Sequence, residues 1–279
     1  MASVCAGFGV PHTPAFPSLL AAEKGPWQEI RDCFAAVATP LAAAELDALV
    51  IFSSDHFNTF FLDNMPTLAI GVAPQASGPN DGTENLPQRI VPIHEDLAGA
   101  LFAGGVEAGF DFALCQELTL DHTFMVPLEL LNVPSDLPIV PIFLNSFVPP
   151  VIAAERARGL GAALRKVVAA QPQELRVGVL ATGSFSLEVG GPRIEPGQPW
   201  GVPDPEWAAR VVDLLGTRDL DRLVEEATPD QIAAAGNAAA EVLDWIAMAA
   251  MVGAPRPTVL RAQAAFGHAY GVFPAEAAL

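Results

Sequence analysis

The chain has 279 residues, of which 32 are acidic and 14 are basic, so its formal net charge at pH 7 is -18. This charge argues against polyanionic partners, and we expect binding neither to nucleic acid nor to a membrane. The N-terminus lacks a signal-peptide pattern, no apolar run is long enough to span a bilayer, and three cysteines without a CxxC spacing are typical of a reducing compartment. The sequence therefore predicts a cytoplasmic protein.

Apolar runs that end in a polar residue alternate with helical patterns in the first part of the chain. Residues 3–10 read as a strand, and Pro11 and His12 follow at once. Residues 27–46 have helical spacing and lead into a second apolar run that ends at Asp55 and His56. Because open α/β sheets place ligands beyond the carboxyl ends of such buried strands, His12 and His56 are candidate site residues.

The same alternation continues along the chain. Further strands are expected at residues 67–72, 112–118, 139–144 and 176–181, a long loop at 74–87, and helices at 95–108, 151–170 and 204–253. His122 follows the strand at 112–118, again directly after an aspartate. We predict one domain over residues 1–279 with an α/β fold: a central mostly parallel or mixed sheet, flanking helices and a helical C-terminal portion. Hydrophobic residues make up 51% of the chain, so we also expect a homo-oligomer.

Two imidazoles and one carboxylate form the facial triad that holds non-heme Fe(II) and leaves coordination positions open. His12 and His56 are the natural imidazole pair. Glu241 is the candidate carboxylate, because it lies near the start of an apolar helix just after Asn237, the expected N-cap. The alternative for Glu241 is a glutamate that only complements the helix dipole.

Five motifs occur in a fixed order along most of the chain: SDHFNTFFLDNMP, LDHTFMVPLELL, LPIVPIFLN, ATGSFSLEVGGPR and AEVLDWIAMAAM. Together they resemble the class III extradiol dioxygenases of the protocatechuate 4,5-dioxygenase beta-subunit superfamily. The resemblance implies an Fe(II) enzyme that opens an aromatic vicinal diol with O2, with a possible small partner subunit. It implies that His12, His56 and Glu241 are the iron ligands and that His122 is a second-sphere acid/base group.

Leu187 departs from the family pattern, whose segment GTGGxSH ends in an acid/base histidine where this chain reads ATGSFSL. Three explanations are open. The substrate is acidic enough to bind as an anion, for example a heteroaromatic diol; His122 does both jobs or His268 reaches the site; or the protein has lost turnover.

Three further residues are assigned to substrate binding. Arg193 is a candidate partner for a substrate carboxylate, with a structural ion pair as the alternative. Phe57 is a candidate wall for an aromatic ring, with plain core packing as the alternative, and Ser184 lies in the segment next to the missing histidine. Two other functions stay open: a non-catalytic or regulatory subunit of the family, and a non-oxidative metal enzyme, for which zinc suits the same ligands.

Overall fold

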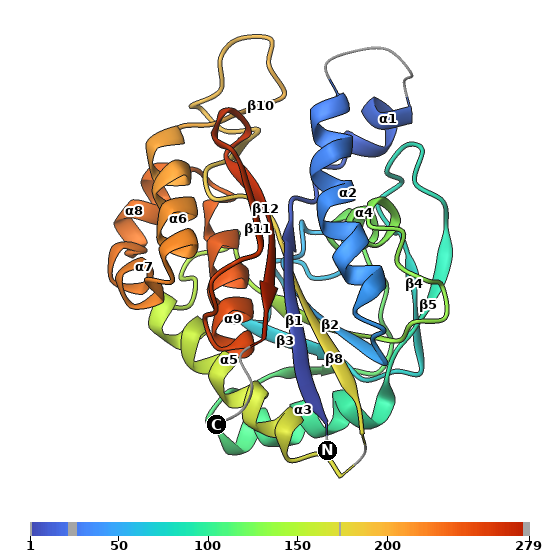
Figure 1. Ribbon diagram of the computed structural model, residues 1–279. Coiled ribbons are helices and arrows are strands. Elements are labelled where there is room, and N and C mark those ends of the chain that lie inside the picture. The colour runs from blue at the N-terminus through green and yellow to red at the C-terminus, as the bar shows by residue number, and fades with distance from the viewer. Residues whose placement is uncertain (1, 22–26, 173, 276–279) are drawn as a thin grey trace.

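The computed structural model describes residues 2–21, 27–172 and 174–275. Within these residues eight strands form one mixed sheet in the order β11-β12-β1-β8-β2-β7-β3-β6 (Figure 1). Their bounds are β1 Ser3–Val10, β2 Ala48–Ser53, β3 Leu68–Gly71, β6 Ala113–Cys115, β7 Ile139–Leu144, β8 Arg176–Thr182, β11 Val259–Gln263 and β12 His268–Pro274. The predicted α/β fold with a central mixed sheet is confirmed.

The centre of the sheet is parallel and its edges are not. The strands β1, β8, β2 and β7 run in the same direction, whereas β12 pairs antiparallel with β1 and β3 pairs antiparallel with β7. Every residue of β2 and of β7 is buried, which explains why both read as uninterrupted apolar runs. The carboxyl ends of the four central strands therefore meet at one edge.

Helices cover both faces of this sheet (Figure 1). One face carries α1 (Phe16–Ala21), α2 (Gln28–Ala43) and α4 (His122–Leu130), and the other carries α3 (Glu95–Glu107), α5 (Ala154–Ala169) and α9 (Val242–Val252). Beyond α9 lie α6 (Pro205–Thr217), α7 (Leu220–Glu226) and α8 (Pro229–Ala235), so the C-terminal portion is helical as expected. Every residue of α9 is buried, yet in the described part of the chain no helix is long and apolar enough to cross a membrane.

The structure contains strands in two segments for which the sequence analysis predicted none. The predicted loop at 74–87 holds β4 (Gln75–Gly78), which forms a hairpin with β5 (Arg89–Pro92). The tail after Pro255 supplies β11 and β12, and β12 joins the main sheet beside β1. A short ladder of β9 (Glu188–Val189) and β10 (Trp200–Gly201) completes the strands of the described residues.

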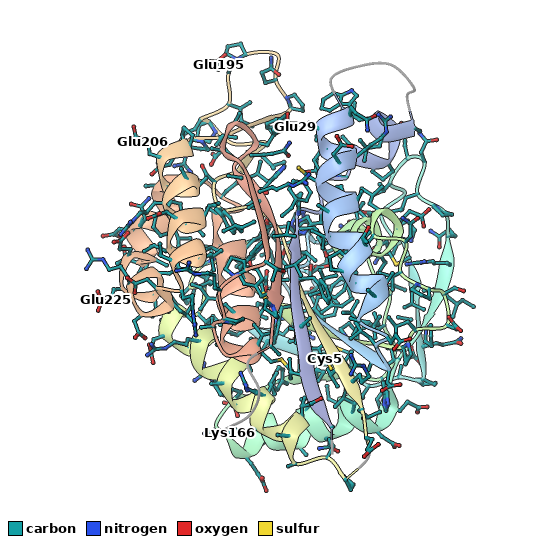
Figure 2. The ribbon with its side chains drawn as sticks, in the orientation of Figure 1. Cys5, Glu29, Lys166, Glu195, Glu206 and Glu225 are labelled. Atoms are coloured by element: carbon teal, nitrogen blue, oxygen red, sulfur yellow. The ribbon has the colours of Figure 1, made fainter. Side chains whose placement is uncertain are left out.

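The charge of the chain is carried by its outer surface. Figure 2 shows Glu195 on the segment before β10, Glu206 at the start of α6 and Glu225 in α7, all on the outside of the molecule. The carboxylates of Asp55, Asp121 and Glu241 are buried instead, and they lie at the carboxyl edge of the central strands.

Candidate active site

Two histidines and one glutamate meet at the carboxyl edge of the parallel strands. His12 follows β1, His56 follows β2, and Glu241 ends the 3-10 helix η1 (Ala239–Glu241) that leads into α9. Because β1 and β2 both pair with β8, these segments leave the sheet close together. The Oε1 atom of Glu241 lies 3.0 Å from Nε2 of His12 and 3.0 Å from Nε2 of His56.

A chain of hydroxyl groups orients the ring of His12. Thr182, at the end of β8, has its Oγ1 2.9 Å from Nδ1 of His12 and 2.6 Å from Oγ of Ser53. The Ser53 hydroxyl donates to the carbonyl oxygen of Thr123, so the Thr182 hydroxyl donates to Ser53 and accepts from the Nδ1–H of His12. The lone pair is then on Nε2, which faces Glu241. Burial lowers the pKa of His12 even though Glu241 acts to raise it, so the ring stays neutral.

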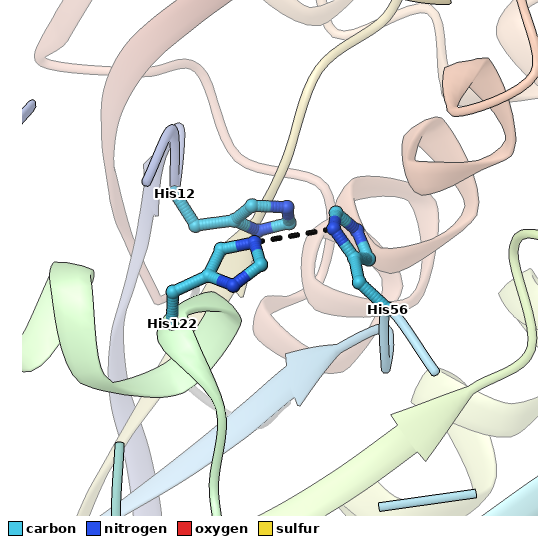
Figure 3. A group of neighbouring side chains, drawn as sticks. All are labelled: His12, His56 and His122. Atoms are coloured by element: carbon cyan, nitrogen blue, oxygen red, sulfur yellow. Dashed lines mark hydrogen bonds between the residues drawn. The ribbon is translucent and has the colours of Figure 1, made fainter. Parts of the chain in front are cut away.

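His122 and Asp81 orient His56 in a similar way. Asp81 pairs with Nδ1 of His122, and Nε2 of His122 lies 3.1 Å from Nδ1 of His56 (Figure 3). In a neutral His122 the Nδ1–H donates to Asp81, so Nε2 of His122 accepts from Nδ1–H of His56, and Nε2 of His56 is left facing Glu241. Burial disfavours a charged Asp81, but its hydrogen bonds with His122 hold its pKa well below the usual range. Burial also acts to lower the pKa of His56, yet the hydrogen bond and charge of Glu241 raise it above its ordinary value.

Glu241 is fully buried, and a different donor holds each of its oxygens. Oε1 accepts from the hydroxyl of Ser54 at 3.3 Å, and Oε2 accepts from the backbone N–H of Ser184 at 2.6 Å. Gly183 is required here, because its φ is +113° and an added Cβ would lie 2.5 Å from Oε2. Burial opposes the negative charge, but the two nearby imidazoles hold the pKa of Glu241 well below its usual range. The carboxylate is therefore ionised.

The aspartates that precede the histidines hold backbone turns. Asp55 accepts from the backbone N–H groups of Thr59 and Phe60 at 2.9 and 3.0 Å. Asp121 caps α4, and its other oxygen accepts from the backbone N–H of His56 at 3.1 Å. These carboxylates are committed to protein donors, so they fix the positions of the histidines and are not free to bind a ligand.

The donor set fits a divalent metal such as Fe(II). Two ligand atoms about 2.1 Å from one metal and at right angles lie about 3.0 Å apart, as Glu241 Oε1 does from each Nε2. Among the described residues, buried Nε2 of His12 has no hydrogen-bond partner, because its approach to Glu241 lacks hydrogen-bond geometry. A lone pair facing a carboxylate oxygen is unfavourable unless a cation lies between them. The ligand atoms of His12, His56 and His122 also lie within 4.8 Å of one another, but Nε2 of His122 faces Nδ1 of His56, so Glu241 is the better third ligand.

A cavity of about 330 Å³ opens onto these histidines. Its polar lining consists of a few groups: His12, Thr13, His56, His122, Ser184 and His268. The remainder of its wall is apolar and comes from several separate segments of the chain: Pro14, Ala15, Phe16, Leu19, Trp27, Leu187, Val189, Pro199, Trp200 and Phe266. A largely apolar cavity with a few convergent polar groups is typical of a small-molecule site.

Leu187 lines this cavity, so an aliphatic side chain lies where the resemblance noted in the sequence would place an acid/base histidine. The adjacent segment pairs with the C-terminal hairpin, since the backbone N–H groups of Phe185 and Ser186 donate to the carbonyl oxygen of Gly267 at 2.6 and 3.1 Å. This pairing brings the next residue, His268, into the lining of the same cavity.

His268 is buried and neutral. It is 2% exposed, and its Nε2 lies 3.0 Å from Oε1 of Gln263, so Nε2 carries the proton and donates it. Burial lowers the pKa of His268 to about 3. Its other nitrogen, Nδ1, has no hydrogen-bond partner within the described residues, and it is left as an acceptor.

Of the three residues expected to bind substrate, only one lines the cavity. Ser184 lines the cavity, whereas Arg193 and Phe57 do not. The guanidinium of Arg193 donates to the carbonyl oxygens of Ala233 and Ala234 at 2.9 and 2.8 Å and pairs with Glu188 at 2.6 Å. Arg193 therefore forms a structural ion pair, which was the alternative to binding a substrate carboxylate. Phe57 is 38% exposed.

The sequence did not reveal the partners that orient the site. Asp81 lies in the segment that was expected to be a long loop. It is far from His122 along the chain, so no local pattern predicts that the two side chains pair. Thr182 is the last residue of β8, and its sequence position does not show that its hydroxyl contacts His12. Asn237 does not cap the helix as expected; its side chain exchanges two hydrogen bonds with the backbone of Val189, at 2.9 and 2.8 Å.

Comparisons with known proteins identify relatives of this chain. Two relatives are named 2,3-dihydroxyphenylpropionate/2,3-dihydroxicinnamic acid 1,2-dioxygenase. The one from Paraburkholderia xenovorans is 37% identical over 161 residues, which are 57% of this chain and 49% of the relative. The one from Pseudomonas putida is 33% identical over 198 residues, 69% of this chain and 57% of the relative. The chain thus matches about half the length of such relatives.

The fold also has a solved counterpart. The crystal structure of the uncharacterized protein JW3007 from Escherichia coli K12 superposes with a TM-score of 0.63 at 14% identity, covering 96% of this chain and 99% of that one. At this identity the likeness concerns the fold alone.

Residues 6–273 match the family described as the catalytic LigB subunit of aromatic ring-opening dioxygenase. The chain belongs to this family.

Proposed function

We propose that the protein is an Fe(II)-dependent extradiol dioxygenase that opens a catechol-like or heteroaromatic vicinal diol with O2. One observation carries the proposal: an unpartnered Nε2 of His12, Nε2 of His56 and the ionised Glu241 converge at one end of a largely apolar cavity. Two histidines and one carboxylate are the donor set of non-heme Fe(II) enzymes. Fe(II) held by these three residues would acidify the diol hydroxyl groups and bring the diol and O2 together.

His122 acts as the acid/base group in this proposal. Its ring lines the cavity beside His56, and the Asp81 carboxylate holds its orientation and stabilises positive charge on it. A substrate hydroxyl that displaces the contact between His122 and His56 gives its proton to Nε2 of His122. The low pKa of Asp81 keeps that carboxylate ionised at neutral pH.

His268 compensates for Leu187 in part. Leucine cannot move a proton, but Nδ1 of the neutral His268 is an acceptor in the lining of the same cavity. A group whose pKa is about 3 is a weak base, so His268 orients a substrate hydroxyl and His122 carries the proton. Ser184, whose backbone N–H already holds Glu241, offers its hydroxyl as a further substrate contact.

Exposed apolar side chains support the homo-oligomer that composition predicts. Phe61 is 54% exposed, Leu62 is 74% exposed and Ile90 is 59% exposed. Exposed apolar groups of this size favour association with another subunit, either a second copy or a small partner. Light scattering of the purified chain at several concentrations tests this, and a monomer throughout would contradict the homo-oligomer.

Oxygen uptake tests the proposed reaction. Protein reconstituted anaerobically with Fe(II) is mixed with aerated catechols, gallates and dihydroxypyridines, while the ring-opened product is followed by its absorbance and mass. We expect uptake matched by product for at least one diol, and no uptake with Zn(II). Stoichiometric iron without uptake for any diol would favour a non-catalytic subunit, and turnover with Zn(II) in the absence of O2 would favour a non-oxidative enzyme.

A further inference from the structure

The cavity is larger than a diol ring requires, and its additional space is apolar. A cavity of 150 Å³ already accommodates a benzene ring, whereas this one has about 330 Å³. The additional wall contains an aromatic row: the Phe16 ring lies 5.9 Å from His268, which stacks on Phe266 at 5.7 Å, and Phe266 lies 5.7 Å from Trp200. Rings in this arrangement favour an aliphatic or aromatic substituent.

No lysine or arginine is among the described residues that line the cavity. Arg193, the expected carboxylate partner, does not line the cavity, and three of its five N–H donors bond to Ala233, Ala234 and Glu188. Glu188 is 2% exposed and also accepts from the backbone N–H of Asn237 at 3.0 Å, so releasing Arg193 would leave a buried charge without its ion-pair partner. Among the residues that the structure describes, a substrate carboxylate would therefore find no cation to offset its desolvation.

Charges around the cavity act in the same direction. Glu29, two residues beyond the lining residue Trp27, and Glu195, on the same segment as Pro199, are both exposed. Figure 2 shows Glu29 at the start of α2 and Glu195 on the segment before β10. Together with the net charge of -18 on the whole chain, these carboxylates disfavour the approach of an anion.

We propose that this site selects a vicinal aromatic diol with an uncharged apolar substituent, alkyl or aryl, and discriminates against diols that carry a carboxylate. This inference rests on the proposed function, since it assigns the substrate class of the same site. It separates the chain from the relatives whose names specify a propionate or a cinnamic acid side chain.

The test compares two diols of similar size, 3-propylcatechol and 3-(2,3-dihydroxyphenyl)propionate. Binding is measured anaerobically on Fe(II)-loaded protein by quenching of tryptophan fluorescence, and kcat/KM is measured separately with O2. We expect the propyl compound to bind about 100-fold more tightly, because the carboxylate must be desolvated without a partner. Equal or tighter binding of the propionate, or binding of neither, would overturn the inference. Selective binding without turnover would contradict the dioxygenase but leave the inference standing.

Val189→Lys supplies the missing cation. Val189 lines the cavity and is 45% exposed, so a lysine there reaches solvent and does not require repacking of the core. We expect the binding preference to shift toward the propionate by about 10-fold or more, the value of one partly exposed ion pair and its relief of desolvation. Val106→Lys, a 43% exposed valine of α3, is the matched control and should leave the preference unchanged. No shift in Val189→Lys would contradict the placement of the substituent in this cavity.

Discussion

Replacing His268 with glutamine should change how the stability of the protein depends on pH. His268 is buried with Nε2 bonded to Gln263, and burial lowers its pKa to about 3. In the unfolded chain a histidine titrates near 6.5. Between these two values the unfolded chain binds a proton that the folded protein excludes, so stability present above pH 6.5 is lost as the pH falls.

The size of this loss follows from the two pKa values. A pH of 5 is about 1.5 units below the pKa of this histidine in the unfolded chain, whereas the histidine in the folded protein is still neutral at that pH. At about 1.4 kcal/mol per unit, acidification from pH 8 to pH 5 costs the protein about 2 kcal/mol through His268 alone. Glutamine keeps an N–H donor for Gln263 but cannot take up the proton, so His268→Gln removes this cost.

Urea unfolding of both proteins at pH 8 and pH 5 measures the difference. Groups that titrate in both proteins cancel when the two pH dependences are subtracted, and any constant effect of the substitution cancels with them. From pH 8 to pH 5, the free energy of unfolding of His268→Gln should fall by about 2 kcal/mol less than the free energy of unfolding of the natural chain. Equal pH dependences would refute the argument that His268 is buried as a neutral ring.

Three further substitutions address the site and its support. Thr182→Val removes the acceptor of His12 Nδ1–H, so the metal dissociation constant should rise about 10- to 100-fold by anaerobic titration; an unchanged affinity would contradict the assigned tautomer. Asp81→Asn should lower kcat about 100-fold or more with full metal content, whereas loss of the metal itself would argue that Asp81 acts on the ligands and not on proton transfer. Asp244 is fully buried with both oxygens unpartnered among the described residues, and burial raises its pKa well above the ordinary value. A raised carboxyl pKa means that stability is lost as the pH rises above about 4, so Asp244→Asn should stabilise the protein at pH 7 by about 1 kcal/mol or more in thermal unfolding; a less stable variant at pH 7 would contradict this.

The central part of the fold was predictable because burial and sequence pattern coincide there. The strands β2 and β7 are buried apolar runs throughout, β8 is buried after Arg176 and β1 over residues 7–10, and parallel strands buried on both faces have this appearance. The strand β12 was missed because alanine, glycine and proline dominate the tail, and its pairing with β1 joins the two ends of the chain. The hairpin of β4 and β5 was missed because proline, glycine and asparagine are also typical of loops.

The positions of His12 and His56 were predictable because each follows a buried strand, and the rule for open sheets places such residues at one edge. Glu241 became a ligand candidate by its position before an apolar helix and by resemblance. The pairing of Asp81 with His122 and the commitment of Arg193 to Glu188 depend on how loops fold back, which no local pattern encodes. Leu187 was identified from the sequence, but the presence of His268 in the lining of the same cavity depends on hydrogen bonds between two distant segments.

Anaerobic titration with Fe(II) tests the central claim most directly. The protein, freed of metal with a chelator, is titrated in the calorimeter alongside Glu241→Gln, which keeps the size of the side chain but loses its charge. We predict one Fe(II) per chain for the natural protein, and at least about 100-fold weaker binding for a variant that remains folded by circular dichroism. Absence of iron binding, or equal binding by Glu241→Gln, would contradict the assignment of His12, His56 and Glu241 as the metal centre.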